Sequence, residues 1–192
     1  MHIYGWREST AGSRGRTAGE SRERGFSLLE MVIVVCAIAL LALLAIDRLW
    51  AMRVDAERVA MEQVAGSLRS ALGIKVANHL AKGDMSGLRA LEGSNPMDRL
   101  SELPQNYLGA LADPDPASVA AGSWYFDLAS RTLVYRVRNE DYFSSSLGPP
   151  ARARFAIRLV YEDRNRNGRF DQAVDGLEGV RFAALESYEW TN

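Results

Sequence analysis

The stretch of residues 24–46 reads RGFSLLEMVIVVCAIALLALLAI, and the fold is decided there. From Phe26 to Ile46, its only polar members are Ser27 and Glu30. At a rise of 1.5 Å per residue, an apolar run of this length forms a helix of about 32 Å, which is enough to cross the hydrocarbon core of a membrane. The stretch therefore predicts a membrane-spanning helix over residues 26–46.

The segment before this helix, residues 1–25, is rich in Gly, Ser, Thr and Arg and shows no apolar periodicity. It contains five Arg and three Glu, a net charge of +2. A secretory signal peptide has a shorter apolar core and a small-residue cleavage site after that core, so this pattern does not fit one. A polar segment that contains arginine stays on the cytoplasmic side, which predicts that the C-terminal part is exported.

Glu30 distinguishes this helix from a simple single-span anchor. A carboxylate within a membrane helix costs about 2.5–3.5 kcal/mol on insertion scales, so a partner is expected. No Lys, Arg or His lies between Phe26 and Ile46. Cleavage between Gly25 and Phe26 would create an α-amine four residues before Glu30. That amine could pair with Glu30 in the same helix or in a neighbouring subunit.

The residues from Arg24 to Glu30, followed by the apolar run, resemble the type III signal of the type IV pilin and pseudopilin family. In that family a prepilin peptidase cuts after the glycine, here Gly25, and N-methylates the new terminal residue, here Phe26. The resemblance also implies that Glu30 pairs with the amine of an adjacent subunit during assembly. One departure is that Asp47 stands where many members carry a helix-kinking proline, and no proline precedes Pro96.

What this resemblance implies is an α+β, pilin-like fold, with a long N-terminal helix packed on a C-terminal antiparallel sheet. The chain would be a structural subunit of a type IV pilus or of a type II secretion pseudopilus, and the missing proline favours a minor pilin or a pseudopilin over a major pilin. Its partners would be the prepilin peptidase, other pilin or pseudopilin subunits and an inner-membrane assembly platform. It would cross the bacterial inner membrane once, with a cytoplasmic N-terminus and a periplasmic C-terminal domain, before entering the filament.

A second hypothesis comes from a different functional class. The chain could be a single-pass, membrane-anchored periplasmic binding protein or enzyme that keeps its leader. In that case Glu30 would lack a ready partner, which argues against this alternative. Identification of the mature N-terminal residue separates the two hypotheses.

Beyond the membrane, residues 47–83 continue as an amphipathic helix, with apolar residues at spacings of three and four. One seven-residue step interrupts this spacing at Glu57-Arg58. We expect the stripe to pack against the protein's own sheet and the helix to end at Lys82-Gly83-Asp84. The stripe consists of Trp50, Val54, Met61, Val64, Leu68, Leu72, Val76 and Leu80.

Residues 84–192 are predicted to form a mixed segment followed by an antiparallel sheet. Short helical turns are expected in the mixed segment, at Ser86–Leu91 and Pro96–Leu100, and a loop at Asp113–Pro116. Alternating apolar and polar residues then predict a hairpin and further strands. The predicted strands are Trp124–Leu128, Thr132–Val137, Arg152–Tyr161 with a basic outer face, Gly179–Ala183 and Ser187–Thr191.

The segment from Asp163 to Asp171 is a candidate calcium loop. Oxygen-bearing side chains stand at Asp163, Asn165 and Asn167, and Gly168 follows at the sixth place. This order matches the first half of an EF-hand-type loop, in which Arg169 would contribute its backbone carbonyl and Asp171 the ninth position. The bidentate acid at the twelfth place is missing, since Val174 occupies it. The alternative is an Asn-Gly turn between two strands.

Composition excludes several other functions. The chain has 23 Lys and Arg against 24 Asp and Glu, a net charge of -1, which offers no basic field for nucleic acid. The single cysteine, Cys36, rules out an intrachain disulfide. No Ser/His/Asp set, phosphate loop or dinucleotide fingerprint is present, so we expect no catalytic site and no enzyme activity. His79 is expected to be a surface residue of the long helix.

Overall fold

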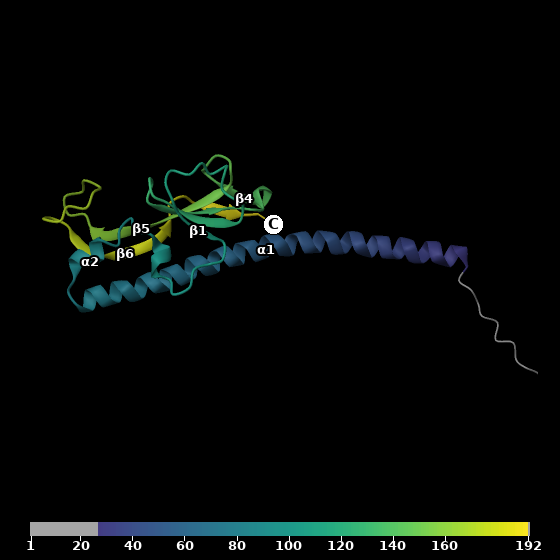
Figure 1. The fold of residues 1–192 in the computed structure, drawn as a ribbon, viewed down its shortest axis with the longest axis horizontal. Helices are drawn as coiled ribbons and strands as arrows, with labels where there is room; N and C mark the ends of the chain where they lie inside the picture. Colours follow the sequence, from purple (N-terminus) through teal and green to yellow (C-terminus); the bar gives the residue numbers. More distant parts are fainter. Residues whose placement is uncertain (1–26, 192) are drawn as a thin grey trace, which may run out of the picture. The chain divides into compact units, whose positions relative to one another are not determined.

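The computed structural model describes residues 27–191, with the side chains of Asp47, Trp50 and Ala51 left out of the description. The chain divides into two compact units between Leu44 and Ala45. In the first unit, the described residues form the beginning of helix α1, which runs from Leu28 to Ala81. The second unit holds the rest of α1 and all the other elements (Figure 1).

The amphipathic part of α1 packs under a β-sheet, as its apolar spacing predicts. Met61, Leu68 and Leu72 are buried in the main core, and Ala65 lies among them. Val64 and Val76 are partly buried against the same core. The end of the predicted stripe differs, because Leu80 remains 41% exposed. The fold is therefore α+β, with a long N-terminal helix packed on a C-terminal sheet.

The elements after α1 agree in type with most of those predicted. Two short helical segments come first, where the sequence indicates them, and seven strands follow. These elements are α2 (Met85–Arg89), η1 (Pro96–Arg99), β1 (Tyr107–Leu111), β2 (Ser123–Asp127), β3 (Thr132–Arg136), η2 (Glu140–Tyr142), β4 (Phe143–Ser145), β5 (Arg152–Glu162), β6 (Gly176–Ala184) and β7 (Tyr188–Trp190).

The main sheet has five strands in the order β1-β2-β3-β5-β6. The neighbours β2-β3, β3-β5 and β5-β6 are antiparallel, as predicted. The sheet is mostly antiparallel, and the exception is β1, a strand that the sequence analysis did not predict and that pairs with β2 in parallel. A second difference is that β7 does not join the main sheet. It pairs with β4 in a separate two-stranded sheet.

Successive side chains along β2, β3 and β5 point alternately to the two faces of the main sheet. Trp124, Leu133 and Phe155 point into the core shared with α1, and the rings of Trp124 and Phe155 are tilted with centroids 5.7 Å apart. Tyr125 and Val134 lie on the opposite face, in a smaller cluster. This outer face also carries the arginines of β5, as the alternation in Arg152–Tyr161 predicts.

The end of α1 is held by local hydrogen bonds at the predicted place. Gly83 has a φ of 65°, a backbone conformation that favours glycine. Asp84 caps α2, accepting a hydrogen bond from Gly87 N at 2.8 Å and one from the Ser86 hydroxyl. With His79 Nδ1 at 2.9 Å as a further partner, these bonds lower the pKa of Asp84 to about 2. His79 is thus a structural contact at the helix end.

Burial of Leu68 gives a test of this helix–sheet core. Leu68→Ala should lower the free energy of unfolding by about 2–5 kcal/mol, because it leaves a cavity where repacking is restricted. The measurement is urea unfolding of the full chain in detergent. Ile74→Ala is the matched control, since Ile74 lies on the same helix and is 64% exposed. Equal effects of the two substitutions would contradict the packing described here.

Candidate functional site

The first part of α1 is an apolar helix that no other part of the described chain covers. Leu28–Ile46 has a mean hydropathy of 3.0, and none of it is buried. In length and composition it could cross a membrane. The helix is therefore suited to membrane anchoring or to a secretion signal. A core helix of a soluble domain would instead be covered by other elements.

Glu30 lies in the first turn of this apolar helix. Ser27 caps the turn, since its Oγ accepts a hydrogen bond from Glu30 N at 3.2 Å. The sequence Ser-Leu-Leu-Glu thus forms one half of a capping box, a local role that the sequence analysis did not assign. Glu30 stands at the end of the apolar helix. The free-energy cost of a charge at the membrane centre is therefore an upper limit to the cost of placing the Glu30 carboxylate in a membrane. Gly25 and Phe26 lie outside the described residues.

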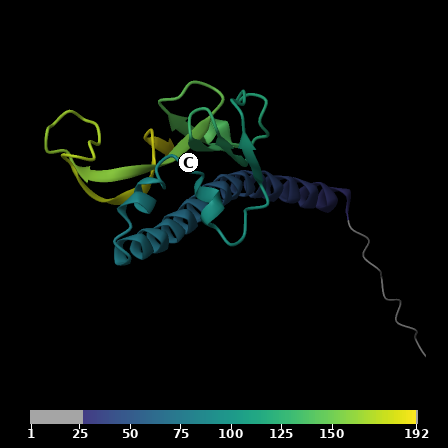
Figure 2. The same cartoon turned by 60° about the vertical axis from the view of Figure 1, so that its left-hand side comes forward.

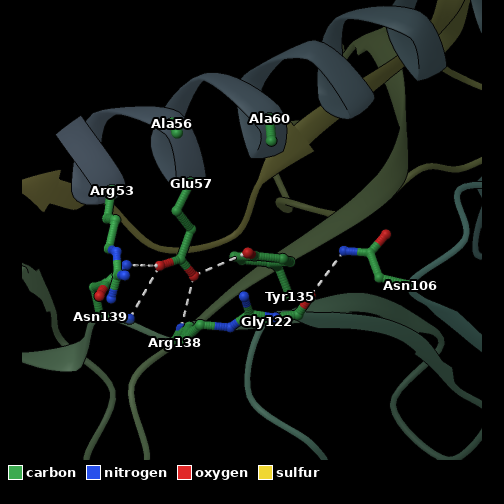
Figure 3. Close-up of a pocket in the computed structure, with 9 residues that line it drawn as sticks. All are labelled: Arg53, Ala56, Glu57, Ala60, Asn106, Gly122, Tyr135, Arg138 and Asn139. Atoms are coloured by element: carbon green, nitrogen blue, oxygen red, sulfur yellow. Dashed lines mark hydrogen bonds between the residues drawn. The ribbon is translucent and has the colours of Figure 1, made fainter. Parts of the chain in front are cut away.

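A polar contact between α1 and the sheet lies in the second unit, around Glu57 (Figure 3). Glu57 Oε1 accepts hydrogen bonds from the Tyr135 hydroxyl at 2.9 Å and from Arg138 N at 2.7 Å. Its Oε2 accepts from Asn139 N at 3.0 Å and from Asn139 Nδ2 at 2.5 Å. One carboxylate therefore binds the chain immediately after β3 to the helix.

The surroundings of Glu57 form an open pocket of about 620 Å³, which Arg53 and Asn106 help to line. Asn106 Nδ2 donates to the carbonyl of Gly122 at 2.7 Å. Burial and the Glu57 carboxylate both raise the pKa of Tyr135, so this phenol stays protonated and keeps donating to Glu57. The Glu57 carboxylate in this pocket accepts four hydrogen bonds, and these hold the helix to the sheet and to the chain after it.

The sequence analysis did not identify Glu57 as a functional position, although an irregularity in the apolar spacing marks it. The apolar spacing along α1 breaks at Glu57-Arg58, between Val54 and Met61. A helical position three residues after a buried one lies on the same face. An acidic residue there must meet donors from whatever covers that face, and Tyr135 with the turn after β3 supplies them.

The candidate calcium loop projects from the ends of β5 and β6 (Figure 2). Its carboxylates bind the loop's own backbone. Asp163 accepts from Asn167 N and Gly168 N, at 3.2 and 2.8 Å. Asp175 accepts from Arg164 N and Asp171 N, at 3.0 and 2.7 Å. The loop is thus longer and more highly organised than a two-residue Asn-Gly turn.

The loop, in this arrangement, does not gather a set of acidic ligands. Asn165 Nδ2 and Asn167 Nδ2 both donate to Asp171 Oδ2, each at 2.6 Å. Among the described residues, no group of three or more His, Cys, Asp or Glu side chains is placed to hold a metal ion. A cation would require both amides to turn their oxygens toward it. Calcium binding by Asp163, Asn165, Asn167, the Arg169 carbonyl and Asp171 stays a prediction.

Comparison with known proteins identifies no relative, since no family model, no curated protein and no solved structure matches the chain.

The Glu57 contact predicts a specific loss of stability. Glu57→Gln should lower the free energy of unfolding by about 1–3 kcal/mol, because the new amide group confronts the donors of Asn139. Glu62→Gln is the matched control, since Glu62 is an exposed acid on the same helix and should change stability by less than about 0.5 kcal/mol. Urea unfolding of both variants in detergent measures the difference. Equal stability of the two would show that the contact contributes little.

The loop between β5 and β6 gives a second prediction. Calcium sites of exported modules have dissociation constants of about 0.1–1 mM, so about 10 mM calcium should stabilise the chain by about 1.4–2.7 kcal/mol. Thermal unfolding with calcium, compared with magnesium at equal ionic strength, measures this. Asp171→Asn should abolish the difference. An identical midpoint in both salts would mean that the loop is a hydrogen-bonded turn without an ion.

Proposed function

We propose that this chain is a pilin-like structural subunit, which a prepilin peptidase cuts between Gly25 and Phe26 and N-methylates at Phe26. The subunit is then extracted from the bacterial inner membrane and assembled through its N-terminal helix into a type IV pilus or a secretion pseudopilus. Its C-terminal domain faces the periplasm before assembly, and its role is that of a minor pilin or a pseudopilin. The observation that carries the proposal is the uncovered apolar helix, with Glu30 in its first turn.

The uncovered apolar helix supports assembly through that helix. Leu28–Ile46 exposes its side chains along its whole length, so it requires an apolar environment that the described residues do not supply. A membrane supplies that environment before assembly, and helices of neighbouring subunits supply it in a filament. Contacts that repeat head to tail without closing build a filament of this kind.

The position of Glu30 supports pairing with a new α-amine. A helix N-terminus carries a partial positive charge, which disfavours an ammonium group and favours a carboxylate nearby. Cleavage after Gly25 would place an ammonium group one residue before Ser27, the residue that caps the helix. Glu30, in the first turn, can offset that charge in its own chain or in a neighbour. Methylation of the amine leaves its charge in place.

The proposed cleavage can be tested directly. Co-expression of the full chain with a prepilin peptidase should yield a mature protein that begins at methylated Phe26. Intact-mass measurement of the detergent-extracted protein, with sequencing of its N-terminus, detects both changes. Gly25→Val should block them, whereas Gly66→Ala, a change at a helical glycine with open space around it, should not. A terminus that remains at Met1 despite active peptidase favours the uncleaved, membrane-anchored binding protein or enzyme.

Glu30 provides a separate test of assembly. Glu30→Gln should leave cleavage intact but lower cross-linking between subunits by about tenfold or more, because the amine loses its charged partner. Cross-linking in membranes that contain the assembly platform measures this yield. Glu62→Gln removes an exposed acid from the same helix and should leave the yield unchanged. Normal assembly of the Glu30 variant would contradict the role proposed for this residue.

A further inference from the structure

We propose that a second site, separate from the apolar helix and from Glu57, binds a phosphate group. The site is a pocket of about 600 Å³, and three arginines from three different elements line it. Arg89 belongs to the end of α2, Arg131 to the turn between β2 and β3, and Arg158 to β5. The proposal does not depend on the pilin-like function, because it concerns only contacts within the second unit.

The pocket forms where β5 continues beyond the end of its neighbour β3. The last aligned pair of these strands is Leu133 with Phe155, so residues from Ala156 onward have no strand partner on that side. The segment after α2 takes this place, and Gly93 N donates to the carbonyl of Ile157 at 3.2 Å. Backbone from two distant parts of the chain therefore forms the floor of the pocket.

Gly93 and Arg131 approach each other closely at this floor. Gly93 has a φ of 63°, and a Cβ added to it would lie 3.1 Å from Cδ of Arg131. Arg131 itself has a φ of 53°, which is uncommon for a residue with a side chain. A larger residue at position 93 would press on the Arg131 side chain. The backbone thus places this arginine over the pocket floor.

The charges around the pocket are unbalanced. Its lining includes three arginines and one acid, Glu92, which gives a net charge of +2. In the part of the chain that the structure describes, none of the three arginines forms an ion pair. Asp127, at the end of β2, does not balance this charge through an ion pair with any described residue. Its carboxylate instead accepts hydrogen bonds from Ala129 N and the Ser130 hydroxyl. Arg158 also stands directly opposite Arg181 on β6, a like-charge pair that disfavours the sheet.

An anion in the pocket would relieve this repulsion, and the arrangement indicates which kind. A guanidinium group donates to oxyanions through two parallel N–H groups. Three such groups offer more donors than the two oxygens of one carboxylate can accept. A phosphate group has three or four acceptor oxygens in a tetrahedral arrangement, so it can meet arginines that approach from three elements. Phosphate is therefore the class of ligand that this pocket fits best.

The experiment uses the full chain in a non-ionic detergent, with ionic strength held constant by chloride so that general screening does not vary. If inorganic phosphate binds with a dissociation constant of about 1 mM, about 10 mM phosphate should raise the unfolding midpoint by about 3–6 °C. Glycerol 3-phosphate tests whether a phosphate carried on a larger molecule binds as well. Acetate at the same ionic strength tests a carboxylate.

The variants separate binding from folding. Arg131→Asn with Arg158→Gln should weaken phosphate binding at least tenfold in equilibrium dialysis, and asparagine tolerates the left-handed backbone at position 131. Arg69→Gln with Lys75→Gln removes two positive charges from the exposed face of α1 and should leave binding unchanged. If the double arginine variant fails to fold, Arg89→Gln replaces it. Equal phosphate responses in both variants, no response in the parent chain, or an equal response to acetate would overturn the proposal.

Discussion

The burial of one stripe of α1 beneath the inner face of the sheet is the constraint on which the rest of the second unit depends. Met61 and Leu68 lie in the same core as Trp124 and Phe155, and without the helix these rings would face water. A sheet with one apolar face needs a second layer to be stable. Glu57 makes this contact specific in position, because its carboxylate oxygens accept hydrogen bonds from backbone N–H groups just after β3. Apolar packing therefore supplies the stability, and the carboxylate defines where along the helix the sheet is held.

The same helix has a second, different part, which is not buried by the residues that the structure describes. Apart from Glu30, the helix is apolar all round between Leu28 and Ile46, whereas the later part is buried on one face only. The later part is buried against the sheet, whereas the earlier part is not buried by any described residue. One helix thus combines an apolar part suited to membrane anchoring or to a secretion signal with a part that belongs to a folded domain.

Much of the fold could be predicted because it depends on periodicity. The three-and-four spacing from Met61 to Leu72 predicts the buried face of α1, and the alternation in Arg152–Tyr161 predicts β5 with its basic outer face. The parallel strand β1 could not be found in this way. Its sequence, YLGAL, is short and contains Gly109, which adopts a φ of 94°. The arginine pocket also escaped prediction, because α2, the β2–β3 turn and β5 meet only in three dimensions.

The two edge strands of the main sheet, β1 and β6, affect how copies of this chain can associate. β1 shows an irregular register between Tyr107 and Ala110, and β5 and β6 shift register between Val160 and Tyr161. β6 also carries Gly179 and the charged Arg181. Irregular geometry and charge at the edges of a sheet discourage strand addition by another molecule. The edges of this sheet are therefore poorly suited to amyloid-like extension or to edge-to-edge pairing between copies of the domain.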